Sequence, residues 1–242
     1  MAAINTRTSP KKESTIVDAG HSFTEENYLK TILKLSEQSE DAVSTNAIAF
    51  RLGTKAATVT DMIRKLSQKK LIHYKKYQGV RLTARGTKVA WAIVRRHRLW
   101  EVFLTEKLHF KWDEIHNIAE ELEHINSEEL VKRLDKFLGF PKFDPHGDPI
   151  PDSKGRLSRI SRTTIKEMQI KQTAIMTGVI DHTSPFLRHL EMLKLTPGKE
   201  IKLLRMLDFD GSCIISINRG EETYISSLVA SNILVSIRNE KV

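Results

Sequence analysis

Two short helical patterns separated by Gly53 constrain the fold of this chain more than any other feature. Ser44 has the residue type of a helix cap, and Gly53 ends the helix that follows in a tight turn. Thr54 is expected to cap the next helix, and the capping-box spacing of Ser22 and Glu25 predicts a longer helix upstream. A long helix followed by two short helices across a turn is the outline of a helix-turn-helix.

A predicted β-hairpin follows these helices. Residues 71–77 and 80–83 have strand character on either side of a turn at Gly79. Such a hairpin forms a wing that can lie along a phosphate backbone, and it strengthens the prediction of a DNA-binding module. The basic residues expected on the wing are Lys75, Lys76 and Arg81.

The charge is unevenly distributed along the chain. Between Arg51 and Arg98 there are 14 Lys or Arg residues and one acid, Asp61. From Asp113 to Glu129 there are seven acids and no Lys or Arg. A basic segment of this density is typical of nucleic-acid binding, and the acidic segment after it indicates a cation-binding module. The alternative for either segment is an ordinary solvated surface.

The acidic segment contains a predicted helix with four metal-capable side chains, namely His116, Glu120, Glu123 and His124. At about 100° per residue, the four fall within roughly 100° of one another, on one face. Imidazole and carboxylate ligands without a thiolate favour the harder first-row divalent ions. The alternative is a solvated acidic helix without a metal.

Length and composition favour a soluble, cytoplasmic, globular protein. The chain has 242 residues, of which 40% are apolar, enough for one large or two small domains. It has no apolar run of membrane-spanning length, and the first residues lack the apolar core of a signal peptide. The single cysteine, Cys213, excludes an intrachain disulfide and is expected to be buried.

Proline content marks a boundary within the chain, because residues 141–151 contain four of its seven prolines. Strand-like segments around a short helix at 185–193 follow, and they predict a small SH3-like barrel. No catalytic motif stands out. The expected segments are a flexible arm (1–21), a winged helix-turn-helix (22–84), a helical metal-binding and dimerisation domain (85–140), a Pro-rich linker (141–162) and the SH3-like domain (163–242).

These motifs together resemble the diphtheria-toxin-repressor family of metal-dependent transcriptional regulators, with its manganese-responsive branch favoured. The resemblance implies a mainly α fold with α+β parts and a C-terminal SH3-like barrel of the FeoA type. It implies a repressor, not an enzyme, that binds palindromic double-stranded DNA as a homodimer and controls metal-uptake genes. The similar segments extend over nearly the whole chain from Phe23, and they are 25–32, 77–83, 96–99, 120–124 and 144–151.

The same resemblance implies a ligand set. It assigns the core position to Glu120, Glu123 and His124, a further ligand from the first helix to Asn27, and a neighbouring position to His97, Glu101 and His116. For His97 the alternative is a phosphate contact. Asp181, His182 or Glu191 of the C-terminal region are considered as further ligands.

Two departures from the family pattern bear on the metal. Manganese-responsive relatives have an aspartate in place of Asn27 and a second acid one turn later, where this chain has Lys30. Glu120 stands where the iron-responsive branch tends to have a cysteine, and a carboxylate favours a harder ion. We therefore expect Mn²⁺, with Fe²⁺ as the alternative and Zn²⁺ less favoured.

The DNA-contacting residues are expected on the second short helix and the wing. Arg64, Lys65 and the three basic wing residues are predicted to contact phosphates. At the start of the helix a Lys can read guanine and a Thr methyl can contact thymine, although each residue has an alternative role as a solvated or capping side chain. The residues of this helix expected to face the bases are Lys55, Ala57, Thr58, Thr60 and Asp61.

The expected mechanism couples the two charged segments. Repulsion among the acids and an untethered first helix are predicted to leave the DNA-binding heads mobile until a divalent ion ties that helix to the acidic helix. Two other functions remain open. One is a metallohydrolase whose bound ions activate water, and the other is a winged-helix regulator that needs no metal.

Overall fold

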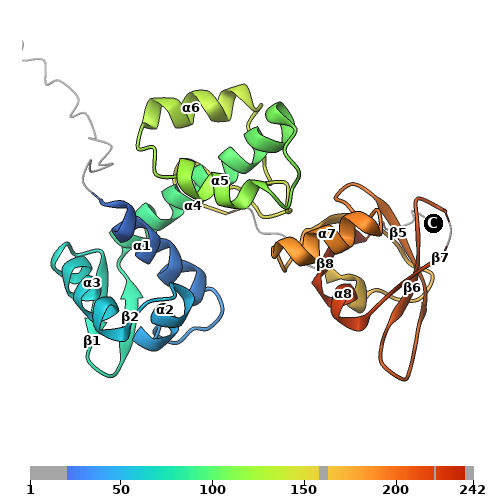
Figure 1. The fold of residues 1–242 in the computed structure, drawn as a ribbon, viewed down its shortest axis with the longest axis horizontal. Helices are drawn as coiled ribbons and strands as arrows, with labels where there is room; N and C mark the ends of the chain where they lie inside the picture. Colours follow the sequence, from blue (N-terminus) through green and yellow to red (C-terminus); the bar gives the residue numbers. More distant parts are fainter. Residues whose placement is uncertain (1–20, 158–162, 221, 238–242) are drawn as a thin grey trace, which may run out of the picture.

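The computed structural model describes residues 21–157, 163–220 and 222–237 (Figure 1). The expected arm at 1–21, apart from His21, lies outside the described residues, and so do residues 158–162 of the expected linker. Within the described ranges, Figure 1 shows an N-terminal head of helices and a hairpin, a helical middle and a C-terminal sheet.

The head contains the helix-turn-helix and wing that the sequence predicts. Ser44 caps its second helix, and Gly53 has a φ of +59° in the turn. One prediction is wrong, because the third helix begins after Lys55, without a side-chain cap, and not after Thr54. The elements are α1 (Phe23–Ser36), α2 (Thr45–Arg51), α3 (Ala56–Gln68), β1 (Ile72–Lys75) and β2 (Gly79–Leu82).

An apolar core and a buried carboxylate hold α1 against α3. Leu29 of α1 and Ile63 of α3 are fully buried members of one core cluster. Glu25 of α1 is 1% exposed and lies 2.8 Å from Lys69 Nζ and 3.1 Å from Lys65 Nζ. Burial alone would raise the pKa of Glu25, but hydrogen bonds from Lys69, from a backbone N–H and from Lys65 lower it to about 2.

The middle of the chain consists of α4 (Ala84–Leu108), α5 (Ile115–Leu122) and α6 (Glu128–Phe137). Ala90 of α4 belongs to the core of the head, whereas Leu104 packs in a cluster with Ile115 of α5, so one continuous helix connects the two parts. The helix predicted for 116–124 ends earlier, at Leu122, but Glu123 caps it with helical backbone angles. Among the described helices, none is long and apolar enough to cross a membrane.

The C-terminal part is a six-stranded antiparallel sheet with the strand order β3-β8-β4-β5-β6-β7. The predicted helix at 185–193 is present within one residue, and Cys213 is buried, as expected. A last helix and strand were not predicted. The elements are β3 (Thr163–Thr164), η1 (Ile165–Glu167), β4 (Thr173–Val179), α7 (Ser184–Met192), β5 (Glu200–Met206), β6 (Cys213–Ile217), β7 (Glu222–Ile225), α8 (Ser227–Asn232) and β8 (Ile233–Ile237).

A loop at 144–148 connects the helical middle to the sheet. The backbone N–H of Val179 donates to the carbonyl of His146 at 2.9 Å. Gly147 and Gly178 approach so closely that a Cβ on Gly178 would lie 2.2 Å from the carbonyl oxygen of His146. This close backbone contact fixes His146 between β4 and the helical middle.

We predict that Gly178→Ala lowers the free energy of unfolding by about 1–3 kcal/mol, because the added methyl group meets backbone atoms that cannot move aside. Thr177→Ala is the matched control, since Thr177 is the exposed neighbour in the same strand. Urea unfolding followed by circular dichroism measures both. Equal stabilities of the two variants would contradict the close contact.

We also predict that Glu25→Gln destabilises the protein by about 2 kcal/mol at pH 7, because it removes charged hydrogen bonds to two lysines. The lowered pKa means that Glu25 contributes stability above about pH 4.5, which is lost as the pH falls toward 2. The difference between variant and wild type should therefore shrink over this range. Denaturant unfolding at several pH values tests it, with exposed Glu40→Gln as the control. If the difference in unfolding free energy between wild type and Glu25→Gln does not depend on pH, the pKa of Glu25 is not lowered in the folded protein.

Candidate metal centre and DNA-binding surface

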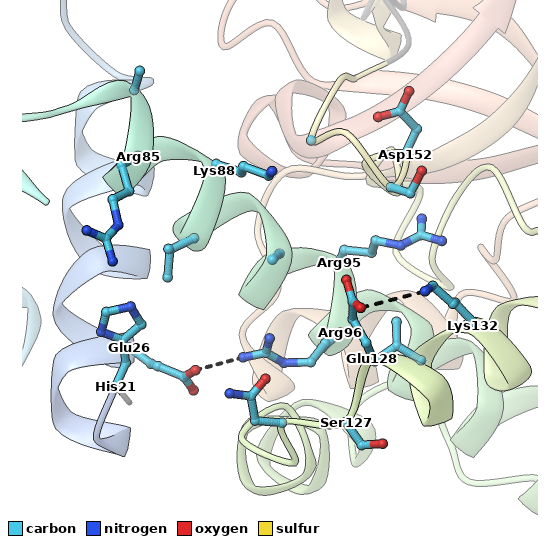
Figure 2. A pocket seen from close by; sticks show the side chains of 17 residues that line it. His21, Glu26, Arg85, Lys88, Arg95, Arg96, Ser127, Glu128, Lys132 and Asp152 are labelled. Atoms are coloured by element: carbon cyan, nitrogen blue, oxygen red, sulfur yellow. Dashed lines mark hydrogen bonds and ion pairs between the residues drawn. The ribbon is translucent and has the colours of Figure 1, made fainter. Parts of the chain in front are cut away.

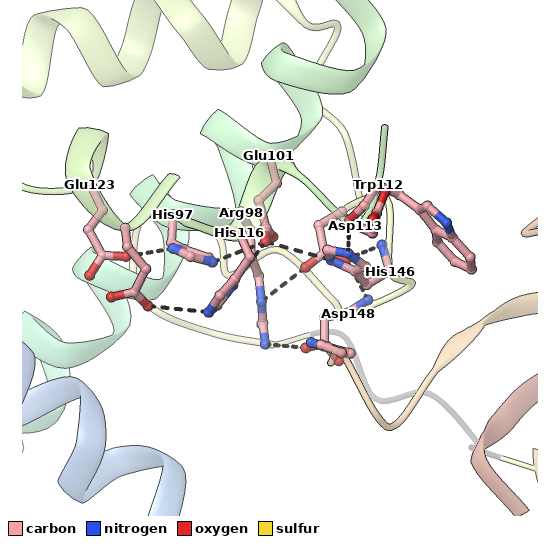
Figure 3. A network of polar contacts seen from close by, with 12 residues as sticks. His97, Arg98, Glu101, Trp112, Asp113, His116, Glu123, His146 and Asp148 are labelled. Atoms are coloured by element: carbon pink, nitrogen blue, oxygen red, sulfur yellow. Dashed lines mark hydrogen bonds and ion pairs between the residues drawn. The ribbon is translucent and has the colours of Figure 1, made fainter. Parts of the chain in front are cut away.

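Five of the predicted ligands come together where α4 packs against α5, and Figure 3 labels four of them, namely His97, Glu101, His116 and Glu123; the fifth is Glu120. His97 and Glu101 lie one turn apart on α4, and both are buried. His97 Nδ1 is 2.6 Å from Glu123 Oε2, and its Nε2 is 3.1 Å from Glu101 Oε1. His116 Nδ1 of α5 is 3.5 Å from the same Glu101 oxygen. His97 thus connects Glu123, the residue after α5, with Glu101 on α4.

These side chains form two overlapping groups of ligand atoms. One consists of His97, Glu101 and His116, and the other of His97, Glu120 and Glu123. Within each group the ligand atoms lie within 4.8 Å of one another. First-row divalent ions bind nitrogen and oxygen at about 2.0–2.2 Å, so ligand atoms across one ion are at most about 4.4 Å apart. Each group is therefore close to the dimensions of a single-ion site.

The other two predicted ligands lie on the α1 side of this cluster. His124 Nε2 is 3.9 Å from Glu123 Oε1, and His124 Nδ1 is 2.6 Å from Glu26 Oε2 of α1. Asn27 Oδ1 is buried and has no hydrogen-bond partner among the described residues. The structure thus places His124 at the edge of the cluster, while no contact within the described ranges joins Asn27 to it.

Direct contacts join α1 to α4 and α5, and the sequence did not predict them. Lys30 Nζ donates to Glu120 Oε1 and to Glu123 Oε1, both at 2.6 Å. Glu26 accepts a hydrogen bond from Arg96 at 2.9 Å. From the sequence, α1 is expected to be untethered until an ion ties it down, whereas here the side chains of the chain itself connect these helices.

A third group of ligand atoms was missed from the sequence, and it consists of Glu101, Asp144 and His146. The Nε2–H group of His146 donates a hydrogen bond to the carbonyl oxygen of Trp112, with 2.8 Å between nitrogen and oxygen. His146 Nδ1 faces Glu101 Oε1 at 3.6 Å and has no hydrogen-bond partner. The sequence signal for this group is Asp144 followed two residues later by His146 in the proline-rich segment. The prolines of this segment indicate only a linker.

Burial and opposite charges together set the protonation of this cluster. Burial would raise the pKa of Glu101, but the charge of His97 and the close imidazoles of His116 and His146 hold it well below its usual value. Burial would lower the pKa of His146, but Glu101 and Asp144 raise it to about 9. Burial, with the charge of Glu101, raises the pKa of Asp144 to about 7. An ion would displace the protons held here, so metal affinity should rise with pH.

The three C-terminal residues considered as further ligands lie in different surroundings. His182 stacks on His146 with ring centroids 4.8 Å apart, and burial lowers its pKa to about 4, which keeps the imidazole neutral. Asp181 accepts a hydrogen bond from a nearby backbone N–H. Glu191 lies 3.9 Å from Lys111. Among these three, His182 has the placement of a residue that supports the cluster.

The donors present fit a divalent ion of the first transition series. They are imidazole nitrogens and carboxylate or amide oxygens, which such ions accept, and the single cysteine belongs to the sheet core. Asn27 Oδ1 is a buried polar atom without a hydrogen-bond partner among the described residues. Leaving such atoms unpaired costs free energy, which a nearby cation would offset.

A cavity of about 700 Å³ lies apart from this cluster, between α1, the first half of α4 and the start of α6 (Figure 2). Its wall contains the ion pair between Glu26 and Arg96. The Arg96 side chain also donates to the backbone carbonyl of Glu123, so it connects the cavity wall to the ligand cluster. A single ion needs far less space, so the ligand cluster and not the cavity is the candidate metal centre.

The residues predicted to contact DNA lie mostly on exposed surface of α3 and the wing. Thr60 is half-buried, and its hydroxyl donates to the Ala56 carbonyl, which turns it toward its own helix. Asp61 accepts a hydrogen bond from Arg64 at 3.3 Å. Lys65 also forms an ion pair with Glu25. The exposed predicted residues are Lys55, Ala57, Thr58, Asp61, Arg64, Lys65, Lys75, Lys76 and Arg81.

Comparison with protein families identifies three consecutive regions. Residues 22–80 match the iron dependent repressor N-terminal DNA binding domain, and residues 83–152 match the iron dependent repressor metal binding and dimerisation domain. Residues 163–237 match the FeoA domain. The expected fold class, helical DNA-binding and dimerisation regions followed by a FeoA-type sheet, is confirmed.

Individual relatives agree with these matches. The chain is 34% identical over 128 residues to the iron-dependent repressor IdeR of Mycobacterium leprae, which is 53% of this chain and 55% of that protein. The chain thus matches only about half the length of this curated relative.

Solved structures are similar over most of the chain. A manganese-dependent transcriptional repressor in complex with manganese is 35% identical, with a TM-score of 0.79, over 88% of this chain and 100% of that one. The manganese regulator SloR is 36% identical, with a TM-score of 0.68, over 88% and 98%. Identity and coverage at this level show that the chain belongs to the family of metal-dependent transcriptional repressors that includes IdeR and the diphtheria toxin repressor.

Proposed function

We propose that this protein is a transcriptional repressor that binds palindromic DNA as a homodimer when a divalent ion occupies the cluster between α4 and α5. One observation supports this most directly. Helix α1 contacts α3, the helix proposed to face DNA, through the ion pair of Glu25 with Lys65, and it contacts the ligand cluster through Glu26 and Lys30. A change at the cluster therefore has a direct route to the DNA-binding surface.

Two neighbouring positions would hold the ion. The first uses Glu120, Glu123 and His97, with His124 and Asn27 on the α1 side. The second uses Glu101, His116 and His97, with Asp144 and His146 of the linker loop next to it. When bound, a divalent ion supplies concentrated positive charge that neutralises the buried carboxylates.

We propose Mn²⁺ as the ion, with Fe²⁺ as the alternative and Zn²⁺ less favoured. The donor set combines carboxylates and imidazoles without a thiolate, and Glu120 adds an oxygen donor, which favours the harder ions. Similar solved structures contain different ions. One similar structure is a repressor in complex with manganese, whereas another, that of ScaR, has bound Zn²⁺.

The conformational effect would pass through the helices of the chain. Glu26 and Lys30 position α1 on α4 and α5, and Glu25 positions α3 on α1. An ordered α1 would hold α3 and the wing at a fixed angle to α4, which extends from the head into the dimerisation region. Moving a population from 1% to 99% competent requires about 5.5 kcal/mol of preferential binding, a demand that coordination of a buried cluster can meet.

A homodimer would place two heads on one palindromic site. The matched dimerisation region, residues 83–152, exposes several large apolar side chains that a second copy would cover. They include Leu108, Phe110, Ile125, Leu130, Phe137 and Phe140. We propose genes for metal uptake as the targets, because repression by the ion would then limit its own import.

A metal-independent regulator remains a second candidate because of one observation. The ammonium of Lys30 already bridges α1 to Glu120 and Glu123, so part of the contact between these helices needs no ion. Family membership speaks against a metallohydrolase. Chelation separates the two regulators, since only the metal-dependent one loses DNA binding.

We predict that the full chain binds fragments from a genomic DNA pool in Mn²⁺ and loses this binding at least tenfold in chelator. Glu123→Gln should abolish the response, because Glu123 is fully buried among the ligand atoms. Glu121→Gln, an exposed acid on the same helix, should behave as wild type. Retention on a fixed-salt DNA column measures this. Equal retention in chelator and Mn²⁺ would establish the metal-independent alternative.

We further predict that exposed wing cations contribute phosphate contacts. Lys76→Ala and Arg81→Ala should weaken binding to all sequences and should each reduce the slope of log K against log salt by about 1. Arg133→Ala, an exposed cation on α6, is the control. Fluorescence anisotropy at several salt concentrations gives the slope. Unchanged slopes in both wing variants would show that these wing residues do not contact the phosphate backbone.

A further inference from the structure

Lys30 lies among the metal-ligand atoms, although it cannot itself coordinate an ion while charged. The residue is 5% exposed. Its Nζ donates to Glu120 Oε1 at 2.6 Å and to the two oxygens of Glu123 at 2.6 and 2.8 Å. Glu120 and Glu123 are the same carboxylates that form a ligand group with His97. The ammonium therefore occupies a cation position within this group.

The charges around Lys30 show what the ammonium does to the cluster. With the imidazoles neutral, as coordination of an ion requires, Glu101, Glu120 and Glu123 together supply three negative charges, and Lys30 supplies one positive charge. The remaining charge of −2 equals that of one divalent ion of opposite sign. A second divalent ion would leave a surplus of positive charge in a region from which water is largely excluded, and this is strongly unfavourable.

We propose that Lys30 is a built-in cation that shares Glu120 and Glu123 with the incoming ion and limits the α1 side of the cluster to a single divalent ion. The proposal rests on the metal-dependent function proposed above. It follows that the incoming ion shares Glu123 with a positive charge nearby, which weakens its binding. The lysine also fixes α1 on α5. The ion therefore binds more weakly, but the contact between these two helices is present before the ion binds.

Three substitutions test this in the full chain. Lys30→Glu replaces the ammonium by a carboxylate, and Lys30→Met removes the charge and adds only a thioether, a soft donor that Mn²⁺ does not favour. Lys34→Glu is the matched control, since Lys34 lies one turn further along α1 and interacts with Glu120 through space, with no hydrogen bond to the cluster among the described residues. The readouts are the number of Mn²⁺ ions per subunit, by elemental analysis after gel filtration, and the Mn²⁺ affinity by calorimetry.

The expected result is one more Mn²⁺ per subunit in Lys30→Glu than in wild type, and the wild-type number in Lys34→Glu. Lys30→Met should bind the wild-type number at least tenfold more tightly. The wild-type number in Lys30→Glu would overturn the proposal. If Lys30→Glu does not fold, an unchanged or weaker affinity in Lys30→Met would overturn it.

Failure of this inference can be told apart from failure of the proposed function. If wild type requires Mn²⁺ for DNA binding but Lys30→Glu gains no ion, the role of Lys30 is wrong and the function stands. If wild type binds no Mn²⁺ at all, the metal-dependent function itself fails.

Discussion

The buried carboxylate of Glu123 is the interaction on which this architecture depends. Glu123 is fully buried, and an unpaired charge in such a place costs several kcal/mol. The chain compensates it from two helices, through His97 of α4 and Lys30 of α1. Because both partners must reach one side chain, α1 and α4 are fixed against the end of α5. The ligand cluster is thus also the junction that holds the head on the helical middle.

Helix α1 relates this junction to DNA binding because its charges are divided between two faces. Glu25 contacts Lys65 of α3 and Lys69 just after it, whereas Glu26 and Lys30 contact the ligand cluster. The first contact positions α3, the helix proposed to face DNA, and the others position α1 itself. The same short stretch of sequence therefore serves both surfaces, and a local change of charge at the cluster can alter the geometry of the head.

Much of the fold could be predicted from sequence, because caps, glycine turns and apolar periodicity act locally. Ser44 and Gly53 set the helix-turn-helix, and they lie where the sequence placed them. The role of Lys30 could not be predicted, since its partners lie about ninety residues away. His146 was missed for the same reason, because its place beside Glu101 depends on the packing of Gly147 against Gly178. Local patterns identify elements, whereas burial and long-range charge decide which side chains meet.

Hydrogen exchange of α1 backbone amides, with and without Mn²⁺, tests directly whether the ion orders this helix. We expect Mn²⁺ to increase protection throughout α1 in the wild-type chain, because the ion adds to the contacts that hold this helix on α4 and α5. We expect no increase in Glu123→Gln, which lacks the central carboxylate. Protection of α1 that is the same with and without Mn²⁺, in a chain whose DNA binding responds to Mn²⁺, would show that α1 does not connect the ion to the DNA-binding head.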